Sequence, residues 1–126
     1  MFTIDETHEM LNEIADTIPQ DLLRELSGGI ILLPQSKLHP QSIDDDLFIL
    51  GEYCISSIGK YIRIYYGSFA NVYKRVTSRE FYYEQLRRVL VHEVRHHNEG
   101  LAGYKDLILY DEDHINEYLN SKKNKK

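Results

Sequence analysis

Apolar residues near the N-terminus recur at the spacing of a helix. The pattern predicts an amphipathic helix over residues 3–18, which Pro19 would stop. The apolar stripe of this helix consists of Ile4, Met10, Leu11, Ile14 and Ile18. A shorter helix is predicted over residues 21–26, closed by the two glycines at positions 28 and 29.

Three short segments in the middle of the chain have the pattern of strands. Residues 30–33 form an uninterrupted apolar run that Pro34 ends, which is typical of a strand covered on both faces. Residues 47–55 and 61–66, joined by a turn at 56–60, predict a hairpin. The polar residues 35–46 before this hairpin and residues 67–76 after it are expected to be loops.

A long helix follows, and a short one is expected near the C-terminus. Thr77 and Glu80 fit a capping box, and nothing breaks a helix from there to residue 99. Gly100 stands where a left-handed residue would close that helix, and residues 101–103 would form a turn. A last helix is predicted over residues 111–120, with Asp111 as its N-cap.

Charge and cysteine content narrow the class of protein. The chain is expected to be one domain over residues 1–126, with a frayed basic tail at 121–126. The net charge of −5 argues against nucleic acid as the main partner. The single cysteine, Cys54, fits a reducing compartment, and no signal peptide or membrane-spanning segment is recognisable, so a cytoplasmic protein is expected, without a membrane partner.

The motif His-Glu-x-x-His at residues 92–96 carries the most specific chemistry. Residues four apart lie on one face of a helix, so His92 and His96 can direct two imidazoles at one zinc ion. Glu93 can then hold a zinc-activated water and accept its proton as a general base. The motif lies beside the apolar stripe of its helix, which favours a cleft over a solvated helix face. This predicts a peptide hydrolase, whose substrate strand would pair with residues 61–66.

Two other functions are compatible with the motif. One is a zinc-binding module that recognises peptides with little or no proteolysis, and the other is a structural domain whose histidines bind metal adventitiously. Glu93 favours the enzyme, because a structural zinc site needs no base at that position.

The third zinc ligand has to come from outside the motif. The metzincin continuation requires glycine and histidine where this chain has Glu99 and Ala102, so that subclass is excluded. Glu99 is about 10 Å from His92 along the helix axis, which is too far for easy sharing of one ion. Asp111 is the preferred candidate, although a helix N-cap role competes for the same side chain. The alternatives downstream are Asp106, Glu112, Asp113, His114 and Glu117.

Several other side chains have less specific expectations. The residues chemically able to stabilise an oxyanion are Tyr65, Tyr66, Tyr83, Tyr104 and Arg95. Arg95 and His97 are also expected to orient carboxylates or to face solvent, and His8 and His39 to lie on the surface.

The chain resembles a family of small bacterial zincin-like metallopeptidases. The resemblance is carried by residues 92–97 with their doubled histidine, by 101–103 and 106–107, and upstream by 29–34, 37–40 and 64–69. It implies an α+β, minimal zinc-protease fold: a small mixed sheet with an N-terminal helix, the active-site helix and a short C-terminal helix. It further implies one zinc ion held by His92 and His96, Glu93 as the base, an acidic third ligand after the active-site helix, and a peptide or protein substrate. In many relatives an aspartate near a glycine follows the motif closely, whereas Glu99 and Gly100 interrupt that pattern here.

Overall fold

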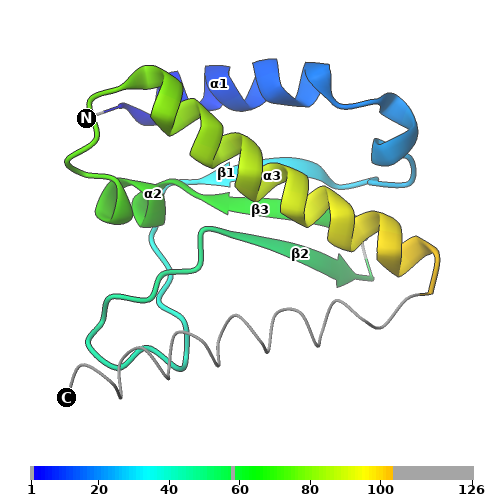
Figure 1. The fold of residues 1–126 in the computed structure, drawn as a ribbon. Coiled ribbons are helices and arrows are strands. Elements are labelled where there is room, and N and C mark those ends of the chain that lie inside the picture. The colour runs from blue at the N-terminus through cyan, green and yellow to red at the C-terminus, as the bar shows by residue number, and fades with distance from the viewer. Residues whose placement is uncertain (1, 58, 104–126) are drawn as a thin grey trace.

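A computed structural model describes residues 2–57 and 59–103 and shows a mixed α+β fold (Figure 1). The described elements are α1 (Ile4–Thr17), the 3-10 helix η1 (Gln20–Leu23), β1 (Gly29–Leu33), β2 (Gly51–Ser56), β3 (Gly59–Tyr65), α2 (Tyr66–Val72) and α3 (Arg79–Leu101). The helix predicted over residues 111–120 lies outside the described residues. None of the described helices has the length and apolar character that a membrane span requires.

The sheet has three strands in the order β1-β3-β2, so β3 is its centre. β3 runs parallel to β1, with Ile62 opposite Ile30, and antiparallel to β2, with Ile62 opposite Tyr53. The predicted hairpin is confirmed, although β2 begins only at Gly51. The expectation that residues 30–33 are covered on both faces is wrong, because β1 lies at an edge and Ile31 is 39% exposed.

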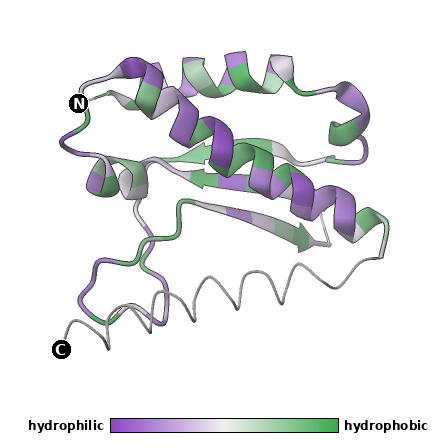
Figure 2. Ribbon diagram, viewed as in Figure 1, coloured by the Kyte–Doolittle hydropathy of each residue, from purple (hydrophilic) through white to green (hydrophobic). Residues whose placement is uncertain are grey.

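The core lies between the sheet and the two long helices, α1 and α3, which pack on one side of it (Figure 1). Its centre is made by the fully buried Ile62 and Ile64 of β3, and by Leu86 and Leu90 of α3. The other members are Met10, Leu11, Ile14, Ile18, Phe69, Tyr82 and Val94. Figure 2 shows the resulting division, with hydrophilic residues along the outer faces of both helices and apolar residues toward the sheet. Burial of these side chains is the main stabilising contribution of the fold.

Capping determines where the two long helices begin. α1 starts after Thr3, whose side chain and that of Glu6 form a reciprocal capping box with bonds of 3.1 and 2.9 Å. α3 starts one residue later than predicted, because the hydroxyl of Ser78, not Thr77, accepts the Phe81 N–H at 3.2 Å.

Two predictions for the segments around α3 are wrong. Gly100 lies inside α3, and Gly103, with φ of 80°, is the left-handed residue after its end. Residues 67–76 are not all loop, because α2 begins at Tyr66 and buries Ser68 and Phe69. The tight approach of Gly67 to the backbone of residues 35 and 36 is a tertiary contact that no local pattern reveals.

Replacing a core leucine of α3 should destabilise the protein far more than replacing an exposed valine of the same helix. We expect Leu86→Ala to lower the free energy of unfolding by about 3 kcal/mol, because it removes buried methyl groups and leaves a cavity. Val91→Ala, at a position 40% exposed, should change it by less than about 0.5 kcal/mol. Urea denaturation measures both, and similar losses would contradict the assigned core.

Candidate active site

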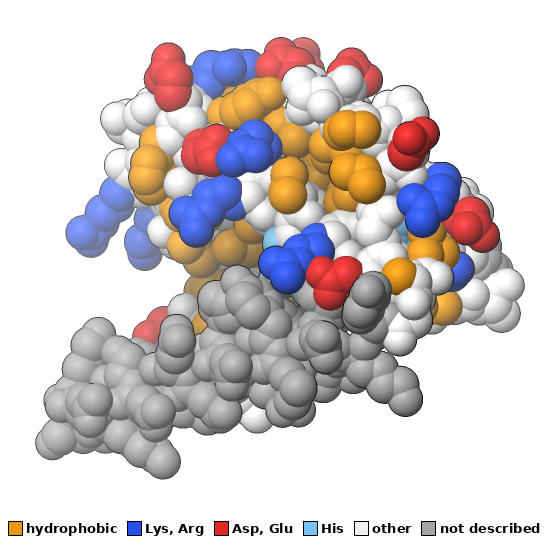
Figure 3. Space-filling view, turned by 45° about the vertical axis from the view of Figure 1, so that its right-hand side comes forward, with side chains coloured by type: hydrophobic (Ala, Val, Ile, Leu, Met, Phe, Trp, Pro, Cys, Tyr) orange, Lys and Arg blue, Asp and Glu red, His pale blue; other side chains and the backbone are white. Residues whose placement is uncertain are grey.

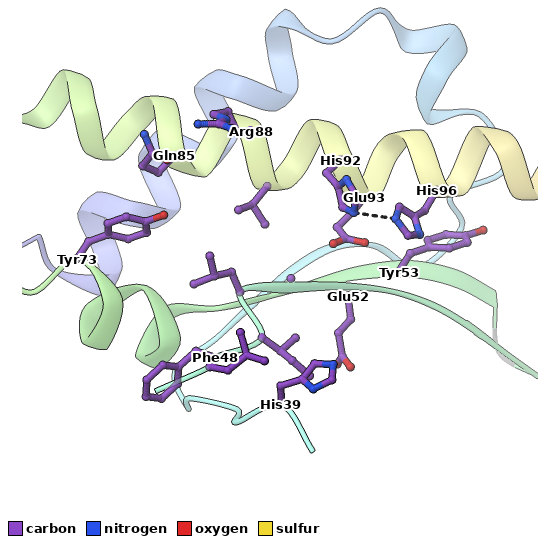
Figure 4. A pocket seen from close by; sticks show the side chains of 15 residues that line it. His39, Phe48, Glu52, Tyr53, Tyr73, Gln85, Arg88, His92, Glu93 and His96 are labelled. Atoms are coloured by element: carbon purple, nitrogen blue, oxygen red, sulfur yellow. Dashed lines mark hydrogen bonds between the residues drawn. The ribbon is translucent and has the colours of Figure 1, made fainter. Parts of the chain in front are cut away.

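A cleft of about 790 Å³ runs between α3 and the edge strand β2, and residues 47–50 line its other wall. His92, Glu93 and His96 of the motif all line it, as Figure 4 shows. The helical period explains this grouping, because Gln85, Val89, His92 and His96 follow each other at spacings of three and four and so form one row. The motif therefore faces a cleft, as the sequence predicted.

The two motif histidines converge on one point. Their Nε2 atoms are 2.8 Å apart and the ring centroids 4.4 Å apart. Nitrogens bound tetrahedrally to the same zinc ion lie about 3.3 Å apart, so a small rotation of one ring would fit the pair to zinc. At 2.8 Å the two rings form a hydrogen bond, in which one ring donates to the other. The donor set and its geometry fit a zinc ion.

The carboxylate of Glu93 lies in the same cleft but is much less accessible. Glu93 is only 6% exposed, and Figure 4 shows its carboxylate directed from α3 toward β2, below His92 and beside His96. Its position on the helix, between the core row and the cleft row, accounts for the burial. Glu93 thus places a carboxylate in the same cleft as the two imidazoles, largely shielded from bulk water.

The second carboxylate of the cleft has a different environment. Glu52 accepts hydrogen bonds from Lys37 Nζ at 2.8 Å and from the Tyr65 hydroxyl at 2.5 Å. Burial opposes its ionisation, but these two bonds outweigh burial and keep the pKa of Glu52 below its ordinary value. Glu52 is therefore a fixed anion that anchors the segment after β1 to β2, and it is poorly suited to accept a proton.

The described residues do not complete a metal site. Residues 2–57 and 59–103 contain no group of three or more His, Cys, Asp or Glu side chains placed to hold one ion. Glu99, one of the alternatives for the third ligand, instead bonds Arg95 Nε at 2.5 Å. The preferred candidate Asp111 and the other downstream alternatives lie outside the described residues.

His97, the second histidine of the doubled pair, has a structural position. It is fully buried, with Nδ1 2.8 Å from the Tyr53 hydroxyl and Nε2 2.6 Å from the Arg24 carbonyl oxygen. Because a carbonyl only accepts, Nε2 donates to Arg24, and Nδ1 and the Tyr53 hydroxyl are hydrogen-bond partners of each other. The expectation that His97 orients a carboxylate or faces solvent is wrong: this side chain ties α3 to β2 and to the end of η1.

Gly51 lets β2 approach α3 closely beside the motif. A Cβ atom at this position would lie 2.8 Å from Val89 Cγ1 and 3.1 Å from Ile64 Cδ1.

The predicted pairing of a substrate with residues 61–66 is also wrong, since β3 is central and already paired on both sides. The strand edge that borders the cleft belongs to β2.

Most of the residues proposed for oxyanion stabilisation are engaged elsewhere. Tyr65 donates to Glu52 and Tyr66 to the Phe2 carbonyl, and neither these tyrosines nor Tyr83 nor Arg95 lines the cleft. Tyr104 lies outside the described residues.

Sequence reasoning missed six polar residues of the cleft: His39, Glu52, Tyr53, Tyr73, Gln85 and Arg88. His39 was expected on the surface, but it lines the wall opposite α3 (Figure 4). Gln85 could have been predicted from the sequence, because it belongs to the helical row that contains His92 and His96. Arg88 could have been predicted in the same way, because it lies one turn before His92. His39 and Tyr73 had no comparable signal, because tertiary folding alone brings their segments to the motif.

Comparison with known proteins finds a likeness among solved structures. No family model matches the sequence, and no curated protein matches it. A solved structure of a conserved hypothetical protein from Thermus thermophilus is similar, with a TM-score of 0.65 and 29% identity over 80% of this chain and 98% of that one. A second protein therefore has a similar fold. Its description names no function, so the evidence for function comes from the cleft of this chain.

Neighbouring histidines of the motif should respond differently to substitution. We expect His97→Ala to lower the free energy of unfolding by about 2–4 kcal/mol, because it leaves a cavity and removes two partly buried hydrogen bonds. His96→Ala, at a partly exposed position, should cost less than about 1 kcal/mol in metal-free protein. Urea denaturation in the presence of a chelator measures both, and a larger loss for His96→Ala would refute the assignment.

Proposed function

We propose that this chain is a zinc-dependent metallopeptidase of the small bacterial zincin-like type. The observation that carries the proposal is the convergence of His92 and His96, whose Nε2 atoms are 2.8 Å apart, beside the buried carboxylate of Glu93 in one cleft. His92 and His96 would hold the ion, and Glu93 would act as the general base.

The reaction is hydrolysis of a peptide bond. Zinc at this site would supply Lewis acidity, which lowers the pKa of water toward neutrality and polarises the peptide carbonyl. Glu93 accepts a proton from the attacking water while the water oxygen forms its bond to the carbonyl carbon. When the carbon–nitrogen bond breaks, Glu93 delivers that proton to the leaving amine. The low exposure of Glu93 keeps this proton from bulk water.

The outer edge of β2, which no strand of the described residues pairs with, favours a peptide as the substrate. The Leu50 carbonyl accepts from the Tyr65 N–H at 2.9 Å, so the backbone of Leu50 faces β3. Because strand residues alternate, the backbone groups of Gly51, Tyr53 and Ile55 face away from β3. Gly51 and Tyr53 line the cleft, so an extended peptide paired with them would pass the motif.

A peptide-binding module without efficient proteolysis is the second candidate function. The same outer edge of β2, unpaired within residues 2–57 and 59–103, supports it, since strand pairing requires no catalysis. Glu93 distinguishes the two functions, because peptide recognition alone gives no reason to bury a carboxylate beside the histidine pair.

Replacing the base should separate hydrolysis from zinc binding. We expect Glu93→Gln to retain about one equivalent of zinc, because the ligands are unchanged, and to lose at least roughly a hundredfold in peptide hydrolysis. Elemental analysis of untagged protein measures the zinc, and mass spectrometry of a digested peptide library measures cleavage.

A matched control replaces the other carboxylate of the cleft. Glu52→Gln removes the same charge 2.8 Å from Lys37 but should leave cleavage within a few-fold of wild type. Equal cleavage by wild type and Glu93→Gln would refute the assigned base. Less than about a tenth of an equivalent of zinc in wild type would refute the metal site.

The third ligand is proposed to be Asp111, and substitution tests this choice. Asp111→Asn should weaken zinc binding at least roughly tenfold, because it removes the negative charge that a zinc carboxylate ligand supplies. Asp106→Asn and Glu99→Gln serve as controls and should leave the affinity within a few-fold. Competition with a chromogenic chelator measures the affinities, and a loss confined to a control variant would move the ligand to that residue.

A further inference from the structure

The arginines of α3 differ in whether they form an ion pair with an acidic residue of the described part of the chain. Arg79 lies 3.7 Å from Glu13, and Arg95 bonds Glu99 at 2.5 Å. Arg87 holds both carboxylate oxygens of Glu84, at 2.9 and 2.6 Å. Arg88, in contrast, makes no ion pair or hydrogen bond with any residue in the described part of the chain.

Arg88 is also the arginine of α3 that lines the cleft. It lies one helical turn before His92, about 6 Å along the axis, on the same side as Gln85 and Tyr73 (Figure 4). Burial raises the pKa of the Tyr73 phenol, and the positive charge of Arg88 opposes this rise. The guanidinium thus stands at the rim of the cleft close to the motif.

The acidic groups near Arg88 are committed to other cations. Both oxygens of Glu84, one turn earlier on α3, are held by Arg87. Glu52, on the opposite wall, is bonded to Lys37. The remaining residues around this part of the cleft, among them Phe48, Val89 and Gln85, are uncharged. Among the described residues, Arg88 acts on Glu84 only through its charge, which helps to lower the pKa of that carboxyl, and forms no ion pair with it. A guanidinium whose hydrogen-bond donors are not taken up by an anion of the described residues, and which lies beside apolar side chains, is suited to bind a carboxylate of a ligand in bidentate fashion.

We propose that Arg88 is a specificity-determining residue that binds a carboxylate of the peptide lying in the cleft, at a fixed distance from the bond beside His92. This inference rests on the proposed function for the identity of the ligand as a peptide. The carboxylate belongs either to a glutamate or aspartate side chain or to the free C-terminus. Both have the same planar, two-oxygen chemistry, and the experiment below distinguishes them.

Binding is measured on the Glu93→Gln protein loaded with zinc, so that no probe is consumed. The probes are three fluorescein-labelled pools of random heptapeptides without other acidic residues. The first has a central glutamate and an amidated C-terminus, the second a central glutamine and a free C-terminus, and the third a central glutamine and an amidated C-terminus. Fluorescence anisotropy gives the dissociation constant of each pool.

One of the two carboxylate pools should bind roughly tenfold more tightly than the neutral pool, which is the effect of one charge-assisted hydrogen bond. Arg88→Gln should remove this preference and leave binding of the neutral pool within twofold. The pool that shows the preference identifies the source of the carboxylate.

Arg87→Gln is the matched control, because it removes the same charge from the adjacent residue. Arg87 lines a different hollow, with Ile18, Leu22 and Val91. Figure 3 shows apolar side chains gathered on one face of the molecule among basic and acidic ones. Arg87→Gln should keep the full preference for the carboxylate pool. An equal loss in both variants would show a general effect of net charge and would overturn the assignment to Arg88, as would equal binding of all three pools.

Cleavage of the same pools by the protein with Glu93 intact tests the proposed function separately. A carboxylate preference that depends on Arg88, without cleavage of any pool, would refute the peptidase and leave the Arg88 site standing. Cleavage that is lost in Glu93→Gln but is indifferent to Arg88→Gln would refute the Arg88 site and leave the peptidase standing.

Discussion

The packing of one face of α3 against the centre of the sheet is the constraint on which the rest of the structure depends. Leu86 and Leu90 of α3 and Ile62 and Ile64 of β3 are all fully buried in this contact. Once that face is fixed, the helical period sets where every other residue of α3 points. The row that contains His92 and His96 then overhangs β2, and Glu93 falls between this row and the core. The chemistry of the cleft is therefore a consequence of the packing of a hydrophobic helix face.

Two contacts keep the cleft narrow at the motif. Gly51 has no side chain to separate β2 from Val89 and Ile64, and His97 joins Tyr53 of β2 to the Arg24 carbonyl. In a close-packed interior such contacts are sensitive to changes of a few tenths of an ångström. The doubled histidine thus combines two roles: His96 faces the cleft, and His97 holds the strand that borders it.

Charge is distributed in the cleft so that each group has a distinct role. Glu52 is fixed by Lys37 and Tyr65 and remains ionised, whereas Glu93 is buried beside two imidazoles. The two carboxylates therefore have different surroundings, and Glu93 is the one that the proposed reaction uses as its base. Arg88 adds a cation on the far side of the histidines from Tyr53 (Figure 4). A peptide along the β2 edge would therefore meet a polar reacting centre and a separate anchoring charge.

The sequence by itself determined the long amphipathic helices, the hairpin and the face that His92 and His96 share, because these depend on periodicity over a few residues. It misjudged the caps of α3, since Thr77 and Ser78 are chemically alike and only backbone geometry selects the serine. It also predicted substrate pairing on β3, which is central and already paired on both sides, because strand order depends on contacts between distant segments. Only the tertiary structure decided that β3 is central, that β2 borders the cleft, and that His39 and Tyr73 join it. The physical reason is that local propensity is encoded residue by residue, whereas the identity of an edge strand or a cleft wall follows from how the whole core packs.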